Sequence, residues 1–381
     1  MIQSGNIQSL DKAISYRNRL TFPFIGITGS NGKTTTKGML CTILGTFGNV
    51  YEFSDHSGSY RRIAEELLNI PHDVDWAVTK VGIGQHKEIS RTTKLLNPYI
   101  GIVTNVGEAH LAYHGSIAAI AKEKMQLIFG IQSDGTAIVN FDNDYTRNMA
   151  KKASVKVKTF ALNEYADYYA SDIEHHGPGG MSLTIRRKIG SRFRLRMPIY
   201  SMGDVYNSLA AVAAADVFNI PDQHITNTLE HDFILPEGRG RLYQRNDFTL
   251  IDDTHDSTPQ SLLKSSKCLA DFKPFSNRLV MILGDMAGLG YKTLDLHKAA
   301  GHYLAAMPID VFLFVGKNAE IMMNALNAYR IKKRLVKAVP TVDRAIEILK
   351  ELVSAGDTVM IEGNETQSHS PIVDALLKEQ V

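Results

Sequence analysis

The sequence predicts an α/β protein made of two domains, each built on a mainly parallel sheet. Three observations support this fold class. Short apolar runs alternate with stretches of helical pattern along most of the chain. A glycine-rich turn follows the first run directly, where a strand would pass into a helix. A second series of the same alternation begins near residue 236, after Leu235-Pro-Glu-Gly-Arg239.

The bulk composition is that of an ordinary globular protein. The chain has 381 residues, 44% of them hydrophobic and 22% charged, which suits two domains, or three. Lys and Arg number 42 against 40 Asp and Glu, so the net charge of +2 gives no reason to expect a nucleic-acid partner. The two cysteines, Cys41 and Cys268, fit neither a disulfide framework nor a zinc site. Without a membrane-length apolar run or a signal-peptide core, the chain is expected to be cytoplasmic and not membrane-bound.

The first domain is expected to follow a polar N-terminal arm over residues 1–20. Its buried strands are predicted at 22–28, 75–81 and 99–104, with a helix over 35–44 after the glycine-rich turn. Residues 154–202 are richer in strand-forming residues and contain the turn signal Gly177-Pro-Gly-Gly180, which predicts an antiparallel excursion. An alanine-rich helix is predicted over 206–218.

The second domain is expected to begin where the punctuation changes, close to residue 236. Its strands are predicted at 249–252, 278–283, 311–315 and 358–361, with helices between them. The chain therefore divides, on this prediction, into an arm over 1–20, a first domain over 21–236 and a second over 237–381.

The turn Gly29-Ser-Asn-Gly-Lys-Thr-Thr-Thr36 has the composition of a phosphate-binding loop. Glycines let backbone N–H groups approach an anion closely, and the following helix adds the partial positive charge of its N-terminus. Lys33 is then placed to reach the outer phosphates, and the Thr34 hydroxyl to hold Mg²⁺. The full spacing of such loops asks for glycine at position 27, where this chain has Ile27. A plain strand–turn–helix connection is the alternative interpretation.

Several segments carry a family resemblance. The segment Ile27-Thr-Gly-Ser-Asn-Gly-Lys-Thr-Thr-Thr36 resembles the ATP loop of the Mur ligases, which form peptide bonds in peptidoglycan precursors. Further matches follow in the family's order, and they are Thr104-Asn-Val-Gly-Glu-Ala-His110, Ala121-Lys-Glu-Lys124, Tyr206-Asn207-Ser-Leu-Ala-Ala, Ile251-Asp-Asp-Thr-His-Asp-Ser-Thr-Pro259 and Ile282-Leu-Gly-Asp-Met286. The last is most similar to the MurF branch, which adds D-Ala-D-Ala. The resemblance runs from Phe24 to Leu377.

The resemblance implies an ATP-dependent ligase with a P-loop central domain and a Rossmann-like C-terminal domain. ATP would phosphorylate a carboxylate, and an amine would displace phosphate from the acyl phosphate. The implied cofactors are ATP with Mg²⁺ or Mn²⁺. ATP would contact Gly29, Ser30, Asn31, Gly32, Lys33, Thr34, Thr35, Asn207, Arg241 (or Arg239) and Asp253.

Three predicted sites, which are His110, Lys124 and the pair at 252–253, also have an interpretation without a functional role. The resemblance makes Lys33, Lys124 and His110 catalytic, with Thr34, His110 and a carbamylated Lys124 as metal ligands. A lone histidine after a strand is otherwise a surface or capping residue, and a lysine in an Ala/Lys-rich helix belongs to a solvated face. The pair at 252–253 would otherwise cap the next helix.

The sequence departs from the family pattern in three ways. About twenty residues precede the first strand, where MurF-like enzymes have a domain that grips the UDP-sugar. Lys80 stands where the family has a metal-binding glutamate, so the local charge is inverted. The family's peptide-, nucleotide- and amine-recognition segments are replaced by Glu52-Phe-Ser-Asp-His-Ser-Gly58, His255-Asp256 and Glu362-Gly-Asn-Glu365.

These departures leave the substrates open. The leading interpretation is a ligase that joins a small-molecule carboxylate to an amine, on a substrate other than the standard UDP-muramoyl tripeptide. A second retains the cell-wall substrate and has a partner chain supply the missing domain. A third, favoured by Lys80, is a nucleotide-binding pseudoenzyme.

Overall fold

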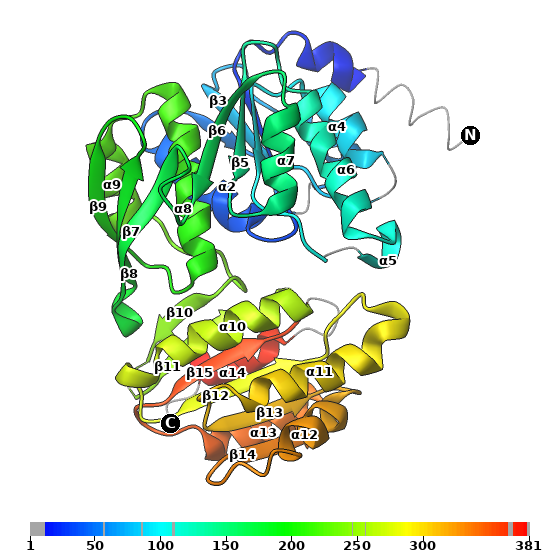
Figure 1. Cartoon of the computed structure of the whole chain (residues 1–381), viewed down its shortest axis with the longest axis vertical. Helices are drawn as coiled ribbons and strands as arrows, with labels where there is room; N and C mark the ends of the chain where they lie inside the picture. Colours follow the sequence, from blue (N-terminus) through cyan, green and yellow to red (C-terminus); the bar gives the residue numbers. More distant parts are fainter. Residues whose placement is uncertain are drawn as a thin grey trace. The chain divides into compact units, whose positions relative to one another are not determined.

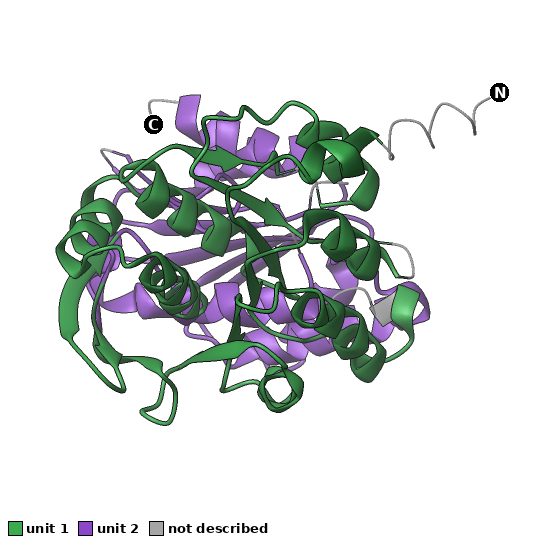
Figure 2. Ribbon diagram, turned by 90° about the horizontal axis from the view of Figure 1, so that it is seen from above, with its two compact units in different colours: residues 1–173, 182–197, 203–233 green, residues 174–181, 198–202, 234–381 purple. Residues whose placement is uncertain are grey.

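The computed structural model describes residues 12–55, 58–84, 87–108, 111–245, 247–255, 257–364 and 369–378. The chain forms two compact units, one of residues 1–173, 182–197 and 203–233, the other of residues 174–181, 198–202 and 234–381 (Figure 2). Each unit has its own sheet, which confirms the predicted α/β class. Within the described residues no helix is both long and apolar enough to cross a membrane.

The sheet of the first unit contains nine strands among the described residues. Its order is β2 (Val50–Glu52), β3 (Trp76–Lys80), β1 (Phe24–Thr28), β4 (Ile100–Val103), β5 (Thr136–Asn140), β6 (Lys156–Ala161), β7 (Tyr168–His175), β8 (Met181–Arg187) and β9 (Arg192–Met197). The pairs from β2 to β7 are parallel. Every residue of β1, β4 and β5 is buried, which explains why these strands are mostly apolar in the sequence.

The predicted antiparallel excursion over residues 154–202 is only partly correct. Strands β6 and β7 extend the parallel part of the sheet, with Phe160 beside Tyr168 and Ala161 beside Tyr169. A parallel pair normally needs a long crossover connection. Here the first residues of β7 pair with the last residues of β6, so a short loop joins the two strands. Strands β7, β8 and β9 follow one another through short turns, and the turn between β7 and β8 is the 3₁₀ turn Gly177–Gly179.

Helices connect these strands (Figure 1). They are α2 (Lys33–Gly45), α3 (Tyr60–Leu67), α4 (Glu88–Leu96), α5 (Leu111–His114), α6 (Ile117–Phe129), α7 (Asp144–Lys152), α8 (Met202–Ala215) and α9 (Asp222–His231), with the 3₁₀ turn Asp216–Phe218 after α8. The core of the unit includes Phe24, Ile63, Leu96 and Leu127.

Two glycines allow α6 to approach the sheet closely. Gly26 of β1 and Gly101 of β4 are paired in register. A Cβ on Gly26 would lie 3.0 Å from Leu127 of α6, and one on Gly101 would lie 3.3 Å from the same side chain and 2.7 Å from Ile131, just after the helix. Because only glycine leaves this space, α6 packs directly onto the strands that lead to the phosphate loop.

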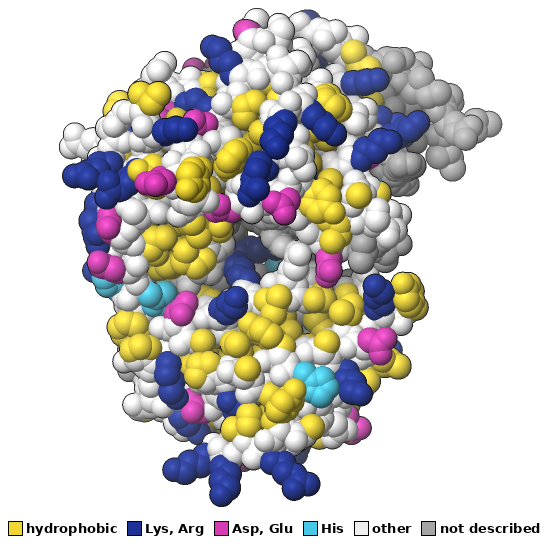
Figure 3. All heavy atoms as spheres, viewed as in Figure 1, with side chains coloured by type: hydrophobic (Ala, Val, Ile, Leu, Met, Phe, Trp, Pro, Cys, Tyr) yellow, Lys and Arg dark blue, Asp and Glu magenta, His cyan; other side chains and the backbone are white. Residues whose placement is uncertain are grey.

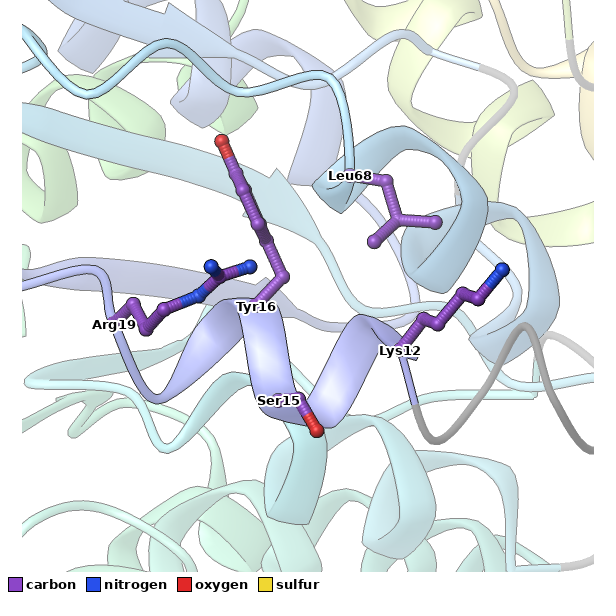
Figure 4. Close-up of a pocket in the computed structure, with 5 residues that line it drawn as sticks. All are labelled: Lys12, Ser15, Tyr16, Arg19 and Leu68. Atoms are coloured by element: carbon purple, nitrogen blue, oxygen red, sulfur yellow. The ribbon is translucent and has the colours of Figure 1, made fainter.

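The polar arm contains a helix over residues 12–17. Arg17 anchors it, since its guanidinium donates to the carbonyls of Leu96 at 2.7 Å, Leu20 at 3.1 Å and Asn97 at 3.2 Å. The guanidinium also lies 4.1 Å from the Phe24 ring centroid. An open hollow beside the helix is lined by Lys12, Ser15, Tyr16, Arg19 and Leu68 (Figure 4).

The sheet of the second unit has the order β10 (Arg241–Gln244), β11 (Thr249–Asp253), β15 (Thr358–Glu362), β12 (Leu279–Gly284), β13 (Val311–Val315) and β14 (Leu335–Val339). Only β10 pairs antiparallel among these described strands. The connections are α10 (Pro259–Asp271), α11 (Thr293–Ala305), α12 (Ala319–Asn327), α13 (Val342–Leu352) and α14 (Ser370–Lys378), with 3₁₀ turns at Lys273–Phe275 and Gly290–Lys292. Acidic and basic side chains are interspersed on the face in Figure 3, as the small net charge leads one to expect.

Candidate active site

The phosphate loop lies between β1 and α2 and comprises Gly29–Gly32. Gly32 caps α2 with φ of +84°, a left-handed conformation in which a side chain would be strained. A Cβ on Gly29 would lie 1.8 Å from the Thr104 hydroxyl, so this position also excludes larger residues. At these two glycines no side chain stands between the loop backbone and an anion that approaches the start of α2.

A second loop, after β4, holds the phosphate loop in shape. The Thr104 hydroxyl donates to the Asn31 carbonyl at 2.5 Å, and the Asn105 amide both donates to that carbonyl at 3.1 Å and accepts from the Asn31 N–H at 2.9 Å. The Ser30 N–H donates to the Asn105 carbonyl at 3.0 Å, and the Gly107 N–H donates to the Ser30 hydroxyl at 2.8 Å. These contacts preorganise the loop, so binding an anion requires little reordering.

Asn207 of α8 closes the loop from another side. Its Oδ1 accepts from the Thr36 hydroxyl at 3.3 Å, and a Cβ on Gly32 would lie 2.2 Å from the same oxygen. Asn207 is buried at the start of an alanine-rich helix whose small side chains pack closely. The structure thus brings this predicted nucleotide residue to the phosphate loop, while contact with a base is a separate expectation.

Lys33 folds back over the loop. Its ammonium donates to the Gly29 carbonyl at 2.8 Å and to the Ser30 carbonyl at 3.3 Å. A phosphate oxygen entering the loop would offer this ammonium a charged acceptor in place of neutral carbonyls, and charge-assisted hydrogen bonds are about twice as strong.

Lys80 lies at the same edge of the sheet, at the end of β3 and in register with Ile27. Its ammonium donates to the Thr34 hydroxyl at 3.2 Å and pairs with Asp55 Oδ1 at 3.1 Å. The side chain is 8% exposed, so the contact with Thr34 is made largely out of water. The residue singled out in the sequence as a departure therefore lies directly against the phosphate-loop threonine.

Lys37, one helical turn after Lys33, completes a charge network in which the lysines are buried and the carboxylates are exposed. Its ammonium contacts Glu52 Oε1 at 2.9 Å, Asp55 Oδ1 at 2.8 Å and the Phe53 carbonyl at 2.6 Å. Burial alone would lower the pKa of Lys37, but its hydrogen bonds to the two carboxylates outweigh burial and raise it. No role for Lys37 was predicted from the sequence, although a lysine on an otherwise buried helix face is a signal that such a network exists.

Lys124 of α6 is 1% exposed, so the solvated-face alternative is wrong. Because Gly26 and Gly101 bring α6 onto the sheet, this side chain is enclosed beside the phosphate loop. Burial, and secondly the nearby Lys33 charge, hold the pKa of Lys124 well below its usual range. A lowered pKa favours the neutral amine over the ammonium form.

A divalent cation does not fit at the Thr34 hydroxyl as the site stands. The Lys80 ammonium already contacts that oxygen, and Asp55 is engaged by two ammonium groups. In the part of the chain that the structure describes, no group of three or more His, Cys, Asp or Glu side chains is arranged to hold a metal ion. His110, the other predicted ligand, lies outside the described residues.

Two further predicted ATP contacts, Asp253 and Arg241, belong to the second unit. Asp253 accepts from the Ser265 hydroxyl at 2.5 Å, and Arg241 pairs with Glu237 at 3.3 Å with its guanidinium 5.3 Å from the Tyr243 ring centroid. Helix α10 is capped by Thr258, so the pair at 252–253 does not cap it. Asp252 instead accepts from the Gly238 N–H at 2.9 Å and holds the start of this unit together.

Comparison with known proteins agrees with this architecture. Residues 27–215 match the Mur ligase middle domain, and residues 238–365 match the Mur ligase glutamate ligase domain. The UDP-N-acetylmuramoyl-tripeptide–D-alanyl-D-alanine ligase of Synechocystis sp. is 29% identical, over 96% of this chain and 77% of the relative. That of Bacillus subtilis is 28% identical, over 98% and 79%. The crystal structure of MurF from Acinetobacter baumannii superposes with a TM-score of 0.87 at 25% identity, covering 98% of this chain and 81% of that one.

The chain belongs to the Mur ligase family. Within the family it is MurF-like, since the similar proteins above and the matching solved structure are MurF ligases. It is therefore an ATP-dependent ligase of the class that forms amide bonds, as the resemblance in the sequence implied.

Proposed function

We propose that this chain uses ATP to join a carboxylate to an amine, with the phosphate loop at Gly29–Gly32 as the ATP site. A carboxylate oxygen attacks the γ-phosphorus and ADP leaves. The amine nitrogen then attacks the acyl carbon of the mixed anhydride, loses a proton and expels phosphate. The observation that carries the proposal is the preorganised loop, in which Thr104, Asn105 and Asn207 fix the backbone around Lys33.

Lys33 has the role of neutralising the negative charge of the phosphate group that is transferred. Its ammonium donates to two carbonyls of the loop, so it already lies beside the place where the loop would hold an anion. Phosphoryl transfer depends mostly on positioning and on neutralising charge, and a partly buried lysine held over a preorganised loop supplies both.

Lys124 is proposed to act as a carbamate. A neutral amine adds to carbon dioxide to give a carbamate anion and a proton, and the low pKa of this buried lysine supports that reaction. The product is a carboxylate-like group at the loop, next to Lys33. Such a group would provide an oxygen ligand for Mg²⁺ or Mn²⁺, and the family resemblance makes His110 a further ligand.

The substrates are proposed to be a peptide-like carboxylate and an amino-acid-like amine, because the relatives are named for such reactants. Glu362 is buried at the strand end where the family has a lysine, and this reversal of charge supports an amine component other than D-Ala-D-Ala. Supply of a UDP-sugar-binding part by a partner chain is a separate proposal, which the same assay would test with that substrate.

The test is phosphate release from ATP by the full chain over a panel of carboxylates and amines. We expect release that requires both reactants together, and an amide product by mass spectrometry. Lys33→Met should abolish it, whereas Lys152→Met, an exposed lysine on α7, should leave it unchanged.

A nucleotide-binding pseudoenzyme is the second candidate, favoured by the Lys80–Thr34 contact. It predicts tight nucleotide binding with no release under any pair of reactants. Binding by the wild type without turnover, in the presence of the family's own substrates, would support it over the ligase.

A further inference from the structure

We propose that the Lys80 ammonium is the built-in cation of the phosphate site and takes the place beside Thr34 that a magnesium ion occupies in phosphate-loop proteins. In those proteins the first hydroxyl of the helix binds Mg²⁺, which bridges the β- and γ-phosphates. Here the corresponding hydroxyl accepts from an ammonium at 3.2 Å. The inference rests on the proposed ATP site and adds that the outer phosphates of a nucleoside triphosphate are neutralised by a lysine.

The position of Lys80 is fixed by the sheet. It is the last residue of β3, and its register partner Ile27 lies just before the phosphate loop on β1. The carboxyl ends of parallel strands meet at one edge, so a long side chain from the end of β3 reaches the first turn of α2. The ammonium is thus delivered by rigid elements to a defined point.

The network around Lys80 holds its ammonium group in place. Asp55 Oδ1 contacts the Lys80 ammonium at 3.1 Å and the Lys37 ammonium at 2.8 Å. Burial would raise the pKa of Asp55, but Lys37 and Lys80 outweigh it and lower it, so the carboxylate stays ionised. Glu52, which contacts the Lys37 ammonium at 2.9 Å, largely balances the charge of that lysine, so Lys80 shares Asp55 with a lysine that has a second carboxylate partner. The Lys80 ammonium therefore has positive charge to offer the outer phosphates of a triphosphate.

A second cation at the same hydroxyl meets repulsion. An ion bound at about 2.1 Å from the Thr34 oxygen, the usual Mg²⁺ distance, would lie no more than about 5.3 Å from the Lys80 nitrogen. Lys37 belongs to the same network through Asp55. The Lys80 ammonium makes a divalent cation at Thr34 unfavourable and at the same time supplies a positive charge at that point.

The experiment measures binding of the β,γ-methylene analogue of ATP to the full chain by calorimetry, with Mg²⁺ and with EDTA. We expect wild-type affinity to differ by less than about threefold between the two conditions. Lys80→Met should weaken binding in EDTA by about tenfold or more, because a charge-assisted contact to phosphate is lost. Lys152→Met is the matched control, and thermal unfolding reports whether each variant is folded.

A second variant reverses the charge at position 80. Lys80→Glu combined with Asp55→Asn places a carboxylate beside Thr34 without a like-charged neighbour. Its affinity should become dependent on Mg²⁺, by about tenfold or more between the two conditions. A merely structural role for Lys80 would not create this dependence.

The outcomes separate the two proposals. Wild-type binding that is lost in EDTA, or Lys80→Met that binds in EDTA as well as the wild type, overturns the role of Lys80 and leaves the ATP site standing. Absence of binding by the folded wild type under both conditions overturns the ATP site and this inference with it.

Discussion

Asp253 and Glu362 are paired in register on neighbouring parallel strands, β11 and β15, inside the second unit. Glu362 is fully buried, and its Oε1 accepts from the Ser261 hydroxyl at 2.8 Å, while Asp253 accepts from Ser265. Burial, and secondly the Asp253 carboxylate, raise the pKa of Glu362 well above its usual range. The pair therefore makes the stability of this unit depend on pH.

The sign follows from linkage. A carboxyl whose folded-state pKa is raised contributes stability that is complete below its unfolded pKa, about 4.3, and is lost as pH rises through the folded value. We expect the melting temperature of the wild type to fall as pH rises from about 5 to about 9 by more than that of Glu362→Gln, which cannot ionise. Calorimetry of the full chain over this range measures both slopes.

The control for Glu362 is Glu351→Gln, since Glu351 is exposed on α13. It should follow the wild type. If Glu362→Gln keeps the wild-type slope, the buried carboxyl is not the titrating group.

Gly32→Ala tests the shape of the phosphate loop. The new methyl would lie 2.2 Å from Asn207 Oδ1, and the left-handed φ of +84° adds strain of about 1 kcal/mol. We expect a loss of stability of about 2 kcal/mol and at least a tenfold loss of nucleotide affinity. Denaturant unfolding and calorimetric titration measure the two effects.

Gly115→Ala isolates the backbone part of that effect. Gly115 also has a positive φ, +73°, but nothing lies within 4 Å of the added methyl. It should lose about 1 kcal/mol and keep its nucleotide affinity. Equal effects at both glycines would show that the Asn207 contact does not shape the loop.

Arg17→Lys tests the anchor of the N-terminal helix. Arg17 serves three carbonyls at once, and an ammonium on a flexible stem does not reproduce that planar fork. We expect a loss of about 1–2 kcal/mol in the free energy of unfolding, measured by urea titration. Arg91→Lys, at an exposed position on α4, should change stability by less than about 0.5 kcal/mol, and an equal loss there would contradict the anchor.

The parts of this fold that the sequence predicts well are those encoded locally. The runs that became β1, β4 and β13 are apolar throughout, and the glycine-rich turn has few alternatives once a strand precedes it. In contrast, β2 has only three residues, too few to show any periodicity. The direction of β7 depends on where β6 ends, which no local pattern records.

The candidate site also contains residues that local motifs predict and residues that only the fold brings together. The loop residues and Asn207 belong to motifs and were predicted, whereas the network of Lys37, Asp55 and Lys80 was not. Lys37 and Asp55 are 18 positions apart, and Lys80 meets Thr34 across 46 positions, through the β1–β3 register. The identity of Lys80 was visible as a departure, but its partners exist only in the folded sheet.

Lys124→Ala is expected to remove turnover while the protein stays folded, because deleting a buried amine that pairs with no described carboxylate leaves no charge stranded. In the wild type, turnover should rise with added bicarbonate and fall at acid pH. The reason is that the carbamate forms only from the neutral amine, which is protonated below the lowered pKa of this lysine. Steady-state phosphate release over a bicarbonate series at each pH measures both trends.

Short carboxylic acids provide the sharper test of the same group. Lys124→Ala removes a fully buried side chain near Lys33, so formate or acetate that enters the space left would restore a carboxylate where the carbamate had been. We expect partial recovery of turnover with these acids and none with methylammonium, which restores only the amine. Recovery with methylammonium, or full wild-type rates in carbon-dioxide-free buffer, would assign Lys124 to the reaction as an amine and remove the carbamate from the mechanism.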